Sequence, residues 1–360
     1  MSDQSYMRLA IEMAKSATGQ TSPNPVVGAV VVKNNQIVGL GAHLKAGEPH
    51  AEVHAIQMAG EKAKDATIYV TLEPCSHFGK TPPCADLVIK SGIKRVVIAA
   101  TDPNPQVAGR GIEKMCARGL EVEVGLLKDE AEALNQVFYH YIQTGLPFVT
   151  LKTAMSLDGK IATSSGHSRW ITGEEAREDV HYYRHRHDAI LVGVNTVLKD
   201  NPSLTTRLPG GGKNPIRIIL DTHLRTPLDS TIIMDGKAET WIVTGSEAEM
   251  SKVKEMEKRG VEVIPLDTPT VKIPLMLKMM GLKGVTSIFV EGGSEVHGSF
   301  LQEKAFQQLI VYFAPRIIGG RDAPSSFGGE GIQVMSEALE VNIINVEKVG
   351  QDIRVIAVPK

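Results

Sequence analysis

Residues 74–84 read PCSHFGKTPPC, and this stretch decides how the first half of the chain is interpreted. The chain has three cysteines, and two of them, Cys75 and Cys84, each follow a proline here. Upstream, the stretch EPHAEVHA places His50 two residues before Glu52. A catalytic zinc ion takes three protein ligands and leaves a fourth position for water. We therefore predict that His50, Cys75 and Cys84 bind a metal.

The residues around these ligands favour bound thiolates. Pro49 precedes His50 and Pro83 precedes Cys84, and proline in such positions is typical of a helix start. A helix N-terminus carries partial positive charge, which stabilises a thiolate relative to a thiol. Two thiolates and a neutral imidazole balance the charge of Zn²⁺, and the ion then lowers the pKa of a bound water.

The order His-x-Glu, then Pro-Cys, then a later Cys is the signature of zinc-dependent nucleobase deaminases. Glu52 is predicted to be the general acid/base rather than a ligand. It would take a proton from the activated water, pass it to a ring nitrogen and later protonate the departing ammonia.

Other interpretations of this loop stay open. A structural zinc site has four protein ligands, and His77 would supply the fourth, although this leaves the His-x-Glu pair unexplained. Two buried free thiols would bind no metal, and iron or cobalt would accept the same ligands as zinc. Cys116 lies in a helical pattern and is predicted to be a core thiol.

Composition favours a two-domain cytoplasmic protein. A chain of 360 residues is long enough for two domains, and Gly145 followed by Pro147 marks a boundary, so we predict domains at 1–145 and 146–360. Lys and Arg number 39 against 41 for Asp and Glu, which gives no support for nucleic-acid or membrane-surface binding. The start of the chain lacks a signal-peptide pattern, and without an apolar run of about 18 residues no membrane-spanning helix is predicted. The small number of cysteines favours a reducing compartment.

Both halves alternate between helical and strand patterns, which predicts α/β layers. In the first half, apolar runs at 26–32, 66–72 and 95–100 read as strands, and 129–145 reads as one long closing helix. In the second half, Asp158-Gly159 between two alternating runs predicts a hairpin. The end of the chain reads as an antiparallel pair turned at Gly350.

Eight residues separate Cys75 from Cys84, whereas deaminases of free nucleosides or nucleic acids typically show Pro-Cys-x-x-Cys. This long loop, with SPNPVVGAVVV before it and TDPNPQVAGRGI after it, resembles the deaminase domain of the bifunctional bacterial riboflavin-biosynthesis deaminase/reductase family. The second half resembles the reductase domain of that family through LKTAMSLDGKIAT, SRWITG, ILVGVNTVLKDNPSLTTR and FVEGGSEVHGSFL. The resemblance covers essentially the whole chain, in family order.

This resemblance implies a cytidine-deaminase-like three-layer domain followed by a dihydrofolate-reductase-like domain. It implies hydrolytic removal of the 2-amino group of 2,5-diamino-6-(5-phosphoribosylamino)pyrimidin-4(3H)-one with zinc, then reduction of the ribosyl group to ribityl with NADPH. It also implies a homo-oligomer. The alternative is a deaminase of another aminopyrimidine or aminopurine whose second half is not catalytic.

The resemblance also implies substrate residues in the first half. Asn24 and Asn104 lie in Pro-Asn-Pro contexts and would otherwise be turn formers, and Lys80 would otherwise be a solvated loop charge. A lysine cation suits a substrate phosphate. The implied set is Asn24, His43, His77, Lys80, Asp102 and Asn104.

In the second half, IFVEGGSEVHGSFL predicts a strand, a glycine pair and a helix, whose N-terminal amides would bind phosphate. It lacks the Gly-x-Gly-x-x-Gly spacing of a Rossmann fold, and a plain turn is the alternative. The resemblance makes it part of a cofactor site that comprises Ala154, Trp170, Thr196, Asp200, Thr222, Gly293, Ser294, Glu295, Val296, His297, Gly298 and Ser299.

Lys152, Asp200 and Glu291 are predicted to be catalytic in the reduction, where an acid must assist opening of the sugar ring. Arginine binds phosphate through two parallel hydrogen bonds, which suits Arg184 and Arg207 for the substrate phosphate. The implied substrate set is Ser168, Arg184, Leu204, Arg207 and Glu291.

The stretch HYYRHRHD places His181 and His185 four residues apart on a predicted helix. No glutamate follows His181, as the helix of a metalloprotease would need. We therefore predict a solvated helix face here, with Arg184 as the functional exception.

Overall fold

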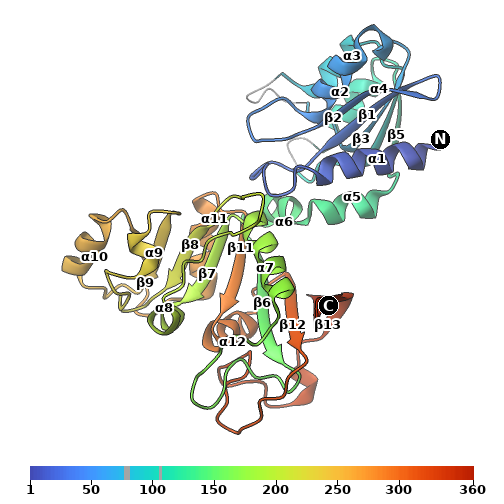
Figure 1. Cartoon of the computed structure of the whole chain (residues 1–360). Coiled ribbons are helices and arrows are strands. Elements are labelled where there is room, and N and C mark those ends of the chain that lie inside the picture. The colour runs from blue at the N-terminus through green and yellow to red at the C-terminus, as the bar shows by residue number, and fades with distance from the viewer. Residues whose placement is uncertain (77–81, 105–107) are drawn as a thin grey trace. The chain divides into compact units, whose positions relative to one another are not determined.

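The computed structural model describes residues 1–76, 82–104 and 108–360, so the predicted substrate residues His77 and Lys80 lie outside the described part. The chain divides into two compact units, Met1–Gly145 and Leu146–Lys360, each built on one sheet (Figure 1). No helix in the described ranges is long and apolar enough to cross a membrane.

The sheet of the first unit has the order β2-β1-β3-β4-β5. β1 runs antiparallel to β2 and β3, and β3, β4 and β5 are parallel. The strands are β1 (Gly28–Lys33), β2 (Gln36–Ala42), β3 (Thr67–Leu72), β4 (Arg95–Ala100) and β5 (Glu121–Val124).

Helices cover both faces of this sheet, which confirms the three-layer prediction (Figure 1). Side chains alternate along a strand, so Val31 packs toward one helical layer and Val30 toward the other. One layer holds α1 (Asp3–Lys15), α5 (Lys128–Leu134) and α6 (Gln136–Thr144). The other holds α2 (Ala51–Ala59), α3 (Cys84–Lys90) and α4 (Arg110–Cys116), and a short 3-10 turn, Gly60–Ala63, follows α2.

The single helix expected at 129–145 is wrong, because Asn135 interrupts it between α5 and α6. The buried Asn135 side chain accepts a hydrogen bond from the Val26 N–H and donates one to the Val26 carbonyl, both at 2.9 Å. These bonds tie the break to a segment far away in sequence, and such a partner is invisible to a local helical pattern.

The second unit contains a nine-stranded sheet in the order β10-β9-β8-β7-β11-β6-β12-β14-β13. Its strands are parallel from β10 to β12, and β14 and β13 are antiparallel. The bounds are β6 (Phe148–Ser156), β7 (Ala189–Gly193), β8 (Ile216–Leu220), β9 (Thr240–Thr244), β10 (Glu262–Pro265), β11 (Ser287–Gly292), β12 (Gln308–Ala314), β13 (Val341–Val349) and β14 (Asp352–Pro359).

This sheet is also covered on both faces, which explains why its central strands are continuous apolar runs. Leu191 of β7 belongs to one core and Ile190 to the core on the opposite face. The helices are α7 (Glu174–Arg186), α8 (Val194–Asp200), α9 (Thr231–Met234), α10 (Met250–Glu257), α11 (Ile273–Leu282) and α12 (Ser294–Gln302), with a 3-10 turn at Met335–Glu337.

The hairpin predicted at Asp158-Gly159 is wrong. The two residues do form a turn, but β6 already pairs with β11 on one side and β12 on the other. Residues after the turn therefore find no free edge, and Lys160 makes an isolated bridge to Ser325. The terminal hairpin of β13 and β14 around Gly350 is confirmed.

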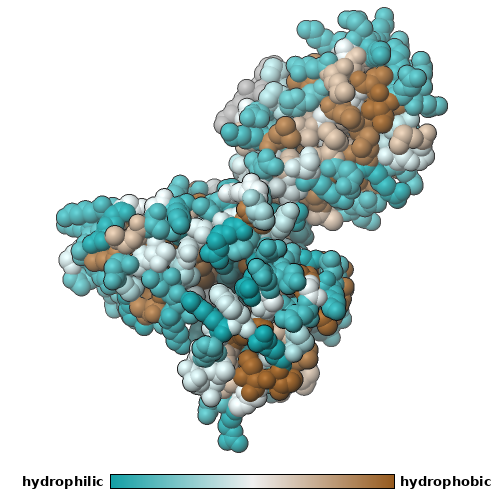
Figure 2. Space-filling view, viewed as in Figure 1, coloured by the Kyte–Doolittle hydropathy of each residue, from teal (hydrophilic) through white to brown (hydrophobic). Residues whose placement is uncertain are grey.

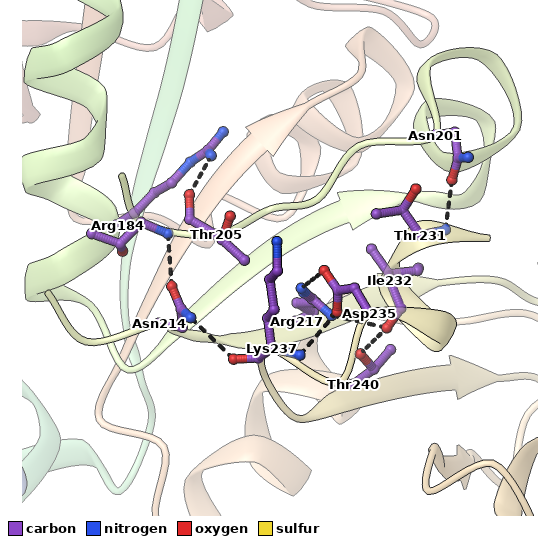
Figure 3. A network of polar contacts seen from close by, with 11 residues as sticks. Arg184, Asn201, Thr205, Asn214, Arg217, Thr231, Ile232, Asp235, Lys237 and Thr240 are labelled. Atoms are coloured by element: carbon purple, nitrogen blue, oxygen red, sulfur yellow. Dashed lines mark hydrogen bonds and ion pairs between the residues drawn. The ribbon is translucent and has the colours of Figure 1, made fainter. Parts of the chain in front are cut away.

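A buried ion pair ties β8 to α9. The Arg217 side chain is fully buried and donates to both carboxylate oxygens of Asp235, at 2.8 and 2.7 Å, and to the Ile232 carbonyl at 2.9 Å (Figure 3). A buried charge without its partner is strongly destabilising. This pair therefore makes the packing of α9 on the sheet sensitive to a single substitution.

We expect Asp235→Asn to lower the free energy of unfolding of the second unit by about 3 kcal/mol, because the Arg217 charge would lose its carboxylate. Urea unfolding followed by tryptophan fluorescence measures this, since Trp170 and Trp241 both belong to this unit. The matched control is Asp229→Asn at an exposed aspartate, which should leave the midpoint unchanged. Equal midpoints for the two variants would contradict the prediction.

Candidate functional site

The three predicted metal ligands meet where two helices of the first unit begin. His50 is the N-cap residue of α2, Cys84 is the first residue of α3, and Cys75 lies in the loop after β3. His50 Nδ1 lies 3.7 Å from Cys75 Sγ and 3.3 Å from Cys84 Sγ. Tetrahedral zinc with one nitrogen and two sulfur ligands needs separations of about 3.5 Å, so these residues fit the ion.

The electrostatics of this cluster favour a thiolate at Cys75. The Cys84 thiol and main-chain N–H donate to the Cys75 sulfur and, with His50, lower the pKa of Cys75 to about 4 against the effect of burial. The same hydrogen bond and burial raise the pKa of Cys84, which holds the shared proton. Soft sulfur ligands with one imidazole are the donor set that zinc accepts, and zinc binding would displace that proton.

Glu52 lies in the first turn of α2 beside the cluster and is buried. Burial, reinforced by negative charge at Cys75, raises the pKa of the Glu52 carboxyl to about 7. It lines a cavity of ≈ 440 Å³ together with His50 and Cys75. A carboxyl group near neutrality at this position is suited to accepting and releasing a proton.

The structure brings the other described residues of the predicted substrate set to the same cavity: Asn24, His43, Asp102 and Asn104. The buried His43 lies 3.2 Å from the Pro49 carbonyl through Nδ1 and 3.1 Å from Asn24 Nδ2 through Nε2. The carbonyl requires a proton on Nδ1, so neutral His43 accepts from Asn24 and fixes the orientation of that amide.

Sequence reasoning missed several residues of this cavity. Phe138 and Ile142 of α6 line it, and no local pattern marks them because α6 is distant in sequence from the other wall residues. Glu73 also lines it, and its place two residues before Cys75 was an available signal. The core position predicted for Cys116 is wrong, because it ends α4 with its thiol exposed.

The second unit contains a cavity of ≈ 570 Å³ at the carboxyl end of β11. Arg184 of α7 binds Glu291 at the end of β11 through two hydrogen bonds of 2.6 and 2.9 Å, and donates to the Thr205 carbonyl at 2.9 Å. Burial works to raise the pKa of Glu291, but the charge of Arg184 outweighs it and holds that pKa at about 2. Glu291 is therefore an anion at neutral pH.

Lys152 of β6 lies in the same cavity, and its ammonium group lies 5.9 Å from the Tyr312 ring centroid. Burial lowers the pKa of Lys152, although the negative charge of Glu291 opposes this effect. A lysine in this setting loses a proton more readily than an exposed lysine, as proton transfer requires.

The N-terminus of α12 opens on this cavity through Gly293 and Ser294. Gly292 has φ +106, and a Cβ there would lie 3.3 Å from the His297 ring. A Cβ on Gly293 would meet only Thr196 Oγ1 within 4 Å, at 3.9 Å, so the space beside it is open. Free main-chain N–H groups beside open space fit the phosphate of a dinucleotide cofactor.

The predicted residues of the second site divide into two groups. Those that line the cavity are Lys152, Ala154, Ser168, Trp170, Arg184, Arg207, Glu291, Gly293, Ser294 and His297. Those outside its lining are Thr196, Asp200, Leu204, Thr222, Glu295, Val296, Gly298 and Ser299. Asp200 is exposed at the end of α8, and its carbonyl accepts a hydrogen bond from Arg169 at 3.1 Å. The roles of both groups stay predictions.

The solvated face predicted for the helix at HYYRHRHD is wrong for His181, which is buried and lines the cavity. Burial, with the charges of Arg184 and Arg207, lowers the pKa of His181 to about 4. The sequence pattern failed because the β11 end and the 201–214 loop both pack against this face of α7.

Polar side chains hold that loop at both ends (Figure 3). Asn214 accepts from the Thr206 N–H at 2.9 Å and donates to the Lys237 carbonyl at 3.0 Å. At the other end, Asn201 accepts from the Thr231 N–H at 2.8 Å. The loop residue Arg207 is therefore presented to the cavity from a fixed backbone.

Two family models match the chain. The RibD C-terminal domain matches residues 147–355, and the cytidine and deoxycytidylate deaminase zinc-binding region matches residues 1–100.

Similar proteins match along nearly the whole chain. The riboflavin biosynthesis protein RibD of Bacillus amyloliquefaciens is 54% identical over 99% of this chain and 96% of its own length, and that of Escherichia coli K12 is 41% identical over 98% of each.

Solved structures agree. RibD of Acinetobacter baumannii is 38% identical with a TM-score of 0.91, and the match covers 99% of both chains. A diaminohydroxyphosphoribosylaminopyrimidine deaminase/5-amino-6-(5-phosphoribosylamino)uracil reductase of Thermotoga maritima is 40% identical with a TM-score of 0.90, over 99% of this chain and 98% of that one. The chain therefore belongs to the RibD family, the bifunctional riboflavin-biosynthesis enzymes that combine a zinc-dependent deaminase with an NADPH-dependent reductase.

Proposed function

We propose that residues 1–145 deaminate 2,5-diamino-6-(5-phosphoribosylamino)pyrimidin-4(3H)-one and that residues 146–360 reduce the ribosyl group of the product. The observation that carries this assignment is the separation of the two chemistries into two cavities. One is lined by His50, Cys75 and a buried carboxyl group, with Cys84 beside the first two, and the other contains a helix N-terminus beside buried charges.

At the first cavity, His50, Cys75 and Cys84 would hold zinc, which would supply Lewis-acid activation of a water molecule. Glu52 takes a proton from that water and delivers it to a ring nitrogen of the pyrimidine. After the water oxygen has bonded to the ring carbon, Glu52 takes a second proton from the new hydroxyl group and gives it to the amino group. The carbon–nitrogen bond then breaks, ammonia leaves as the carbonyl forms, and the Glu52 carboxylate returns to its starting state. The Asn24 amide, oriented by His43, supports orientation of the ring.

In the second cavity, NADPH when bound supplies the hydride that adds at the sugar C1′. The sugar ring must open before the hydride adds. Lys152 would donate the proton that the oxygen of the sugar ring requires. Glu291 holds Arg184 through their ion pair, and its negative charge favours the protonated form of Lys152. Arg207 is free of a carboxylate partner among the described residues and is our choice for the substrate phosphate.

Glu52→Gln should abolish deamination, because the amide cannot carry the proton, while zinc stays bound at one per chain. Reduction of the deaminated substrate should continue at the wild-type rate. Ammonia release, metal analysis and NADPH oxidation measure the three quantities. The matched control is Glu61→Gln at an exposed glutamate of the same unit.

Two outcomes would contradict parts of the proposed function. Unchanged deamination in Glu52→Gln would rule out the proposed acid/base role. Ammonia release from the wild-type enzyme without any NADPH consumption would mean that the second unit is not catalytic.

Arg207→Ala should raise the KM of the reduction about 10- to 100-fold, because it removes a charge-assisted hydrogen bond to phosphate worth about 1.5–3 kcal/mol. Deamination by the same protein should be unaffected. Steady-state kinetics with the deaminated substrate measures this, with Arg259→Ala at an exposed arginine of the same unit as control. A fall in kcat at constant KM would place Arg207 elsewhere in the mechanism.

We also propose that the enzyme is a homo-oligomer in the cytoplasm. β13 is an edge strand of the second sheet, and it exposes Ile343, Ile344 and Val346 at 64, 57 and 63%. Figure 2 shows hydrophobic residues at the surface of this unit among hydrophilic ones. Exposed apolar edge strands favour pairing with another chain, and a reducing compartment keeps ligand thiols available.

Ile344→Lys should shift the enzyme toward monomers by placing a charge in this interface. Sedimentation velocity at several protein concentrations measures the shift. Leu282→Lys makes the same change at a leucine that is 75% exposed on α11, and should leave the assembly intact. An unchanged distribution for Ile344→Lys would exclude β13 as the contact.

A further inference from the structure

Glu73 directly follows the last residue of β3 and precedes the ligand Cys75 by two residues. It is 3% exposed and lines the ≈ 440 Å³ cavity. The deamination steps above do not use it. Burial of a carboxylate is costly unless hydrogen bonds compensate, so its partners indicate its role.

Among the described residues, four main-chain N–H groups donate to this carboxylate. Oε2 accepts from Asp102 at 3.4 Å and from Gly109 at 3.0 Å. Oε1 accepts from Gly111 at 3.0 Å and from Ile112 at 3.4 Å. One side chain therefore binds the backbone at both ends of the segment 102–112.

Helix α4 depends on this carboxylate for its N-terminal cap. Its N-cap residue is Gly109, which has φ +76 and no side chain to accept the first free N–H groups. Glu73 supplies that acceptor from 36 residues earlier in the chain. Gly111 permits the approach, since a Cβ there would lie 2.2 Å from the Pro74 carbonyl oxygen.

The Glu73 hydrogen bonds also determine the position of one wall of the cavity. Asp102 and Asn104 both line it, and Asp102 Oδ1 accepts a hydrogen bond from the Asn104 N–H at 2.9 Å. The Glu73 contact to the Asp102 N–H thus fixes the start of a short rigid turn. Glu52 and the ligands His50 and Cys84 belong to other elements, α2 and α3.

We propose that Glu73 is a positioning residue for deamination, which holds the Asp102–Asn104 wall in register with the strand that leads to Cys75. It acts on substrate binding through that wall and not on proton transfer. This inference rests on the proposed assignment of the cavity to the pyrimidine substrate.

Glu73→Gln keeps the size of the side chain but turns an amino group toward two of the four N–H donors. We expect the KM of deamination to rise about 10-fold, with kcat within about threefold of wild type. Zinc content and the reductase activity of the same protein should be unchanged. Hydrogen exchange of the substrate-free enzyme should accelerate in the described residues of 102–112 and not in α2.

Glu113→Gln is the matched control, because it makes the same change at an exposed glutamate of α4. Glu73→Asp keeps the charge with a shorter reach and should give an intermediate KM, which tests the proposal even if the Gln variant does not fold. A wild-type KM in Glu73→Asp and Glu73→Gln, or a loss confined to kcat, would overturn it. Retained deamination in Glu52→Gln would instead overturn the proposed function.

Discussion

The first active site depends on two helices that begin at the same point in space. The starts of α2 and α3 bring His50 and Cys84 together, and the loop from β3 adds Cys75 between them. Partial positive charge at the helix starts and N–H donation to sulfur stabilise the thiolate form. The burial of the Glu52 carboxyl group follows from the same geometry, because Glu52 lies in the first turn of α2, directly beside the three ligands.

The second site uses a different electrostatic arrangement. It places the ion pair of Arg184 and Glu291 at the end of a parallel strand, and the lysine of a neighbouring strand beside it. Ligand sites of parallel α/β sheets lie at the carboxyl ends of strands, and this cavity follows that rule without a Rossmann glycine pattern. Both units thus build their sites at the carboxyl ends of strands and the N-termini of helices, although the chemistry of the two sites differs.

Much of this was predictable from sequence, because the informative residues are close together along the chain. The order of His50, Cys75 and Cys84, with Glu52 two residues after His50, predicted a zinc centre, and family motifs predicted the reductase half. Local patterns failed where a distant segment decides the outcome. Asn135 breaks a helix through its hydrogen bonds to Val26. β6 forms no hairpin because a parallel strand already pairs with each of its edges.

The same limit applies to the site residues. His181 looked like part of a solvated helix face, and only the packing of other elements around α7 makes it part of a cavity. Phe138 and Ile142 carry no motif at all. Residues that act through their shape or by positioning the backbone form weaker sequence patterns than residues that bind a metal or transfer a proton.

The order of residues at the end of β11 has a further consequence. Glu291, which binds Arg184, lies only two residues before Gly293, where the proposed cofactor-binding turn begins. Under the proposed assignment one strand positions both reactants, because the pairing of β11 with β6 and β7 fixes the distance between Glu291 and Gly293. Under that assignment, a residue inserted between Glu291 and Gly293 would move the substrate contact and the cofactor turn together, whereas changes in the surrounding loops would alter the substrate side alone.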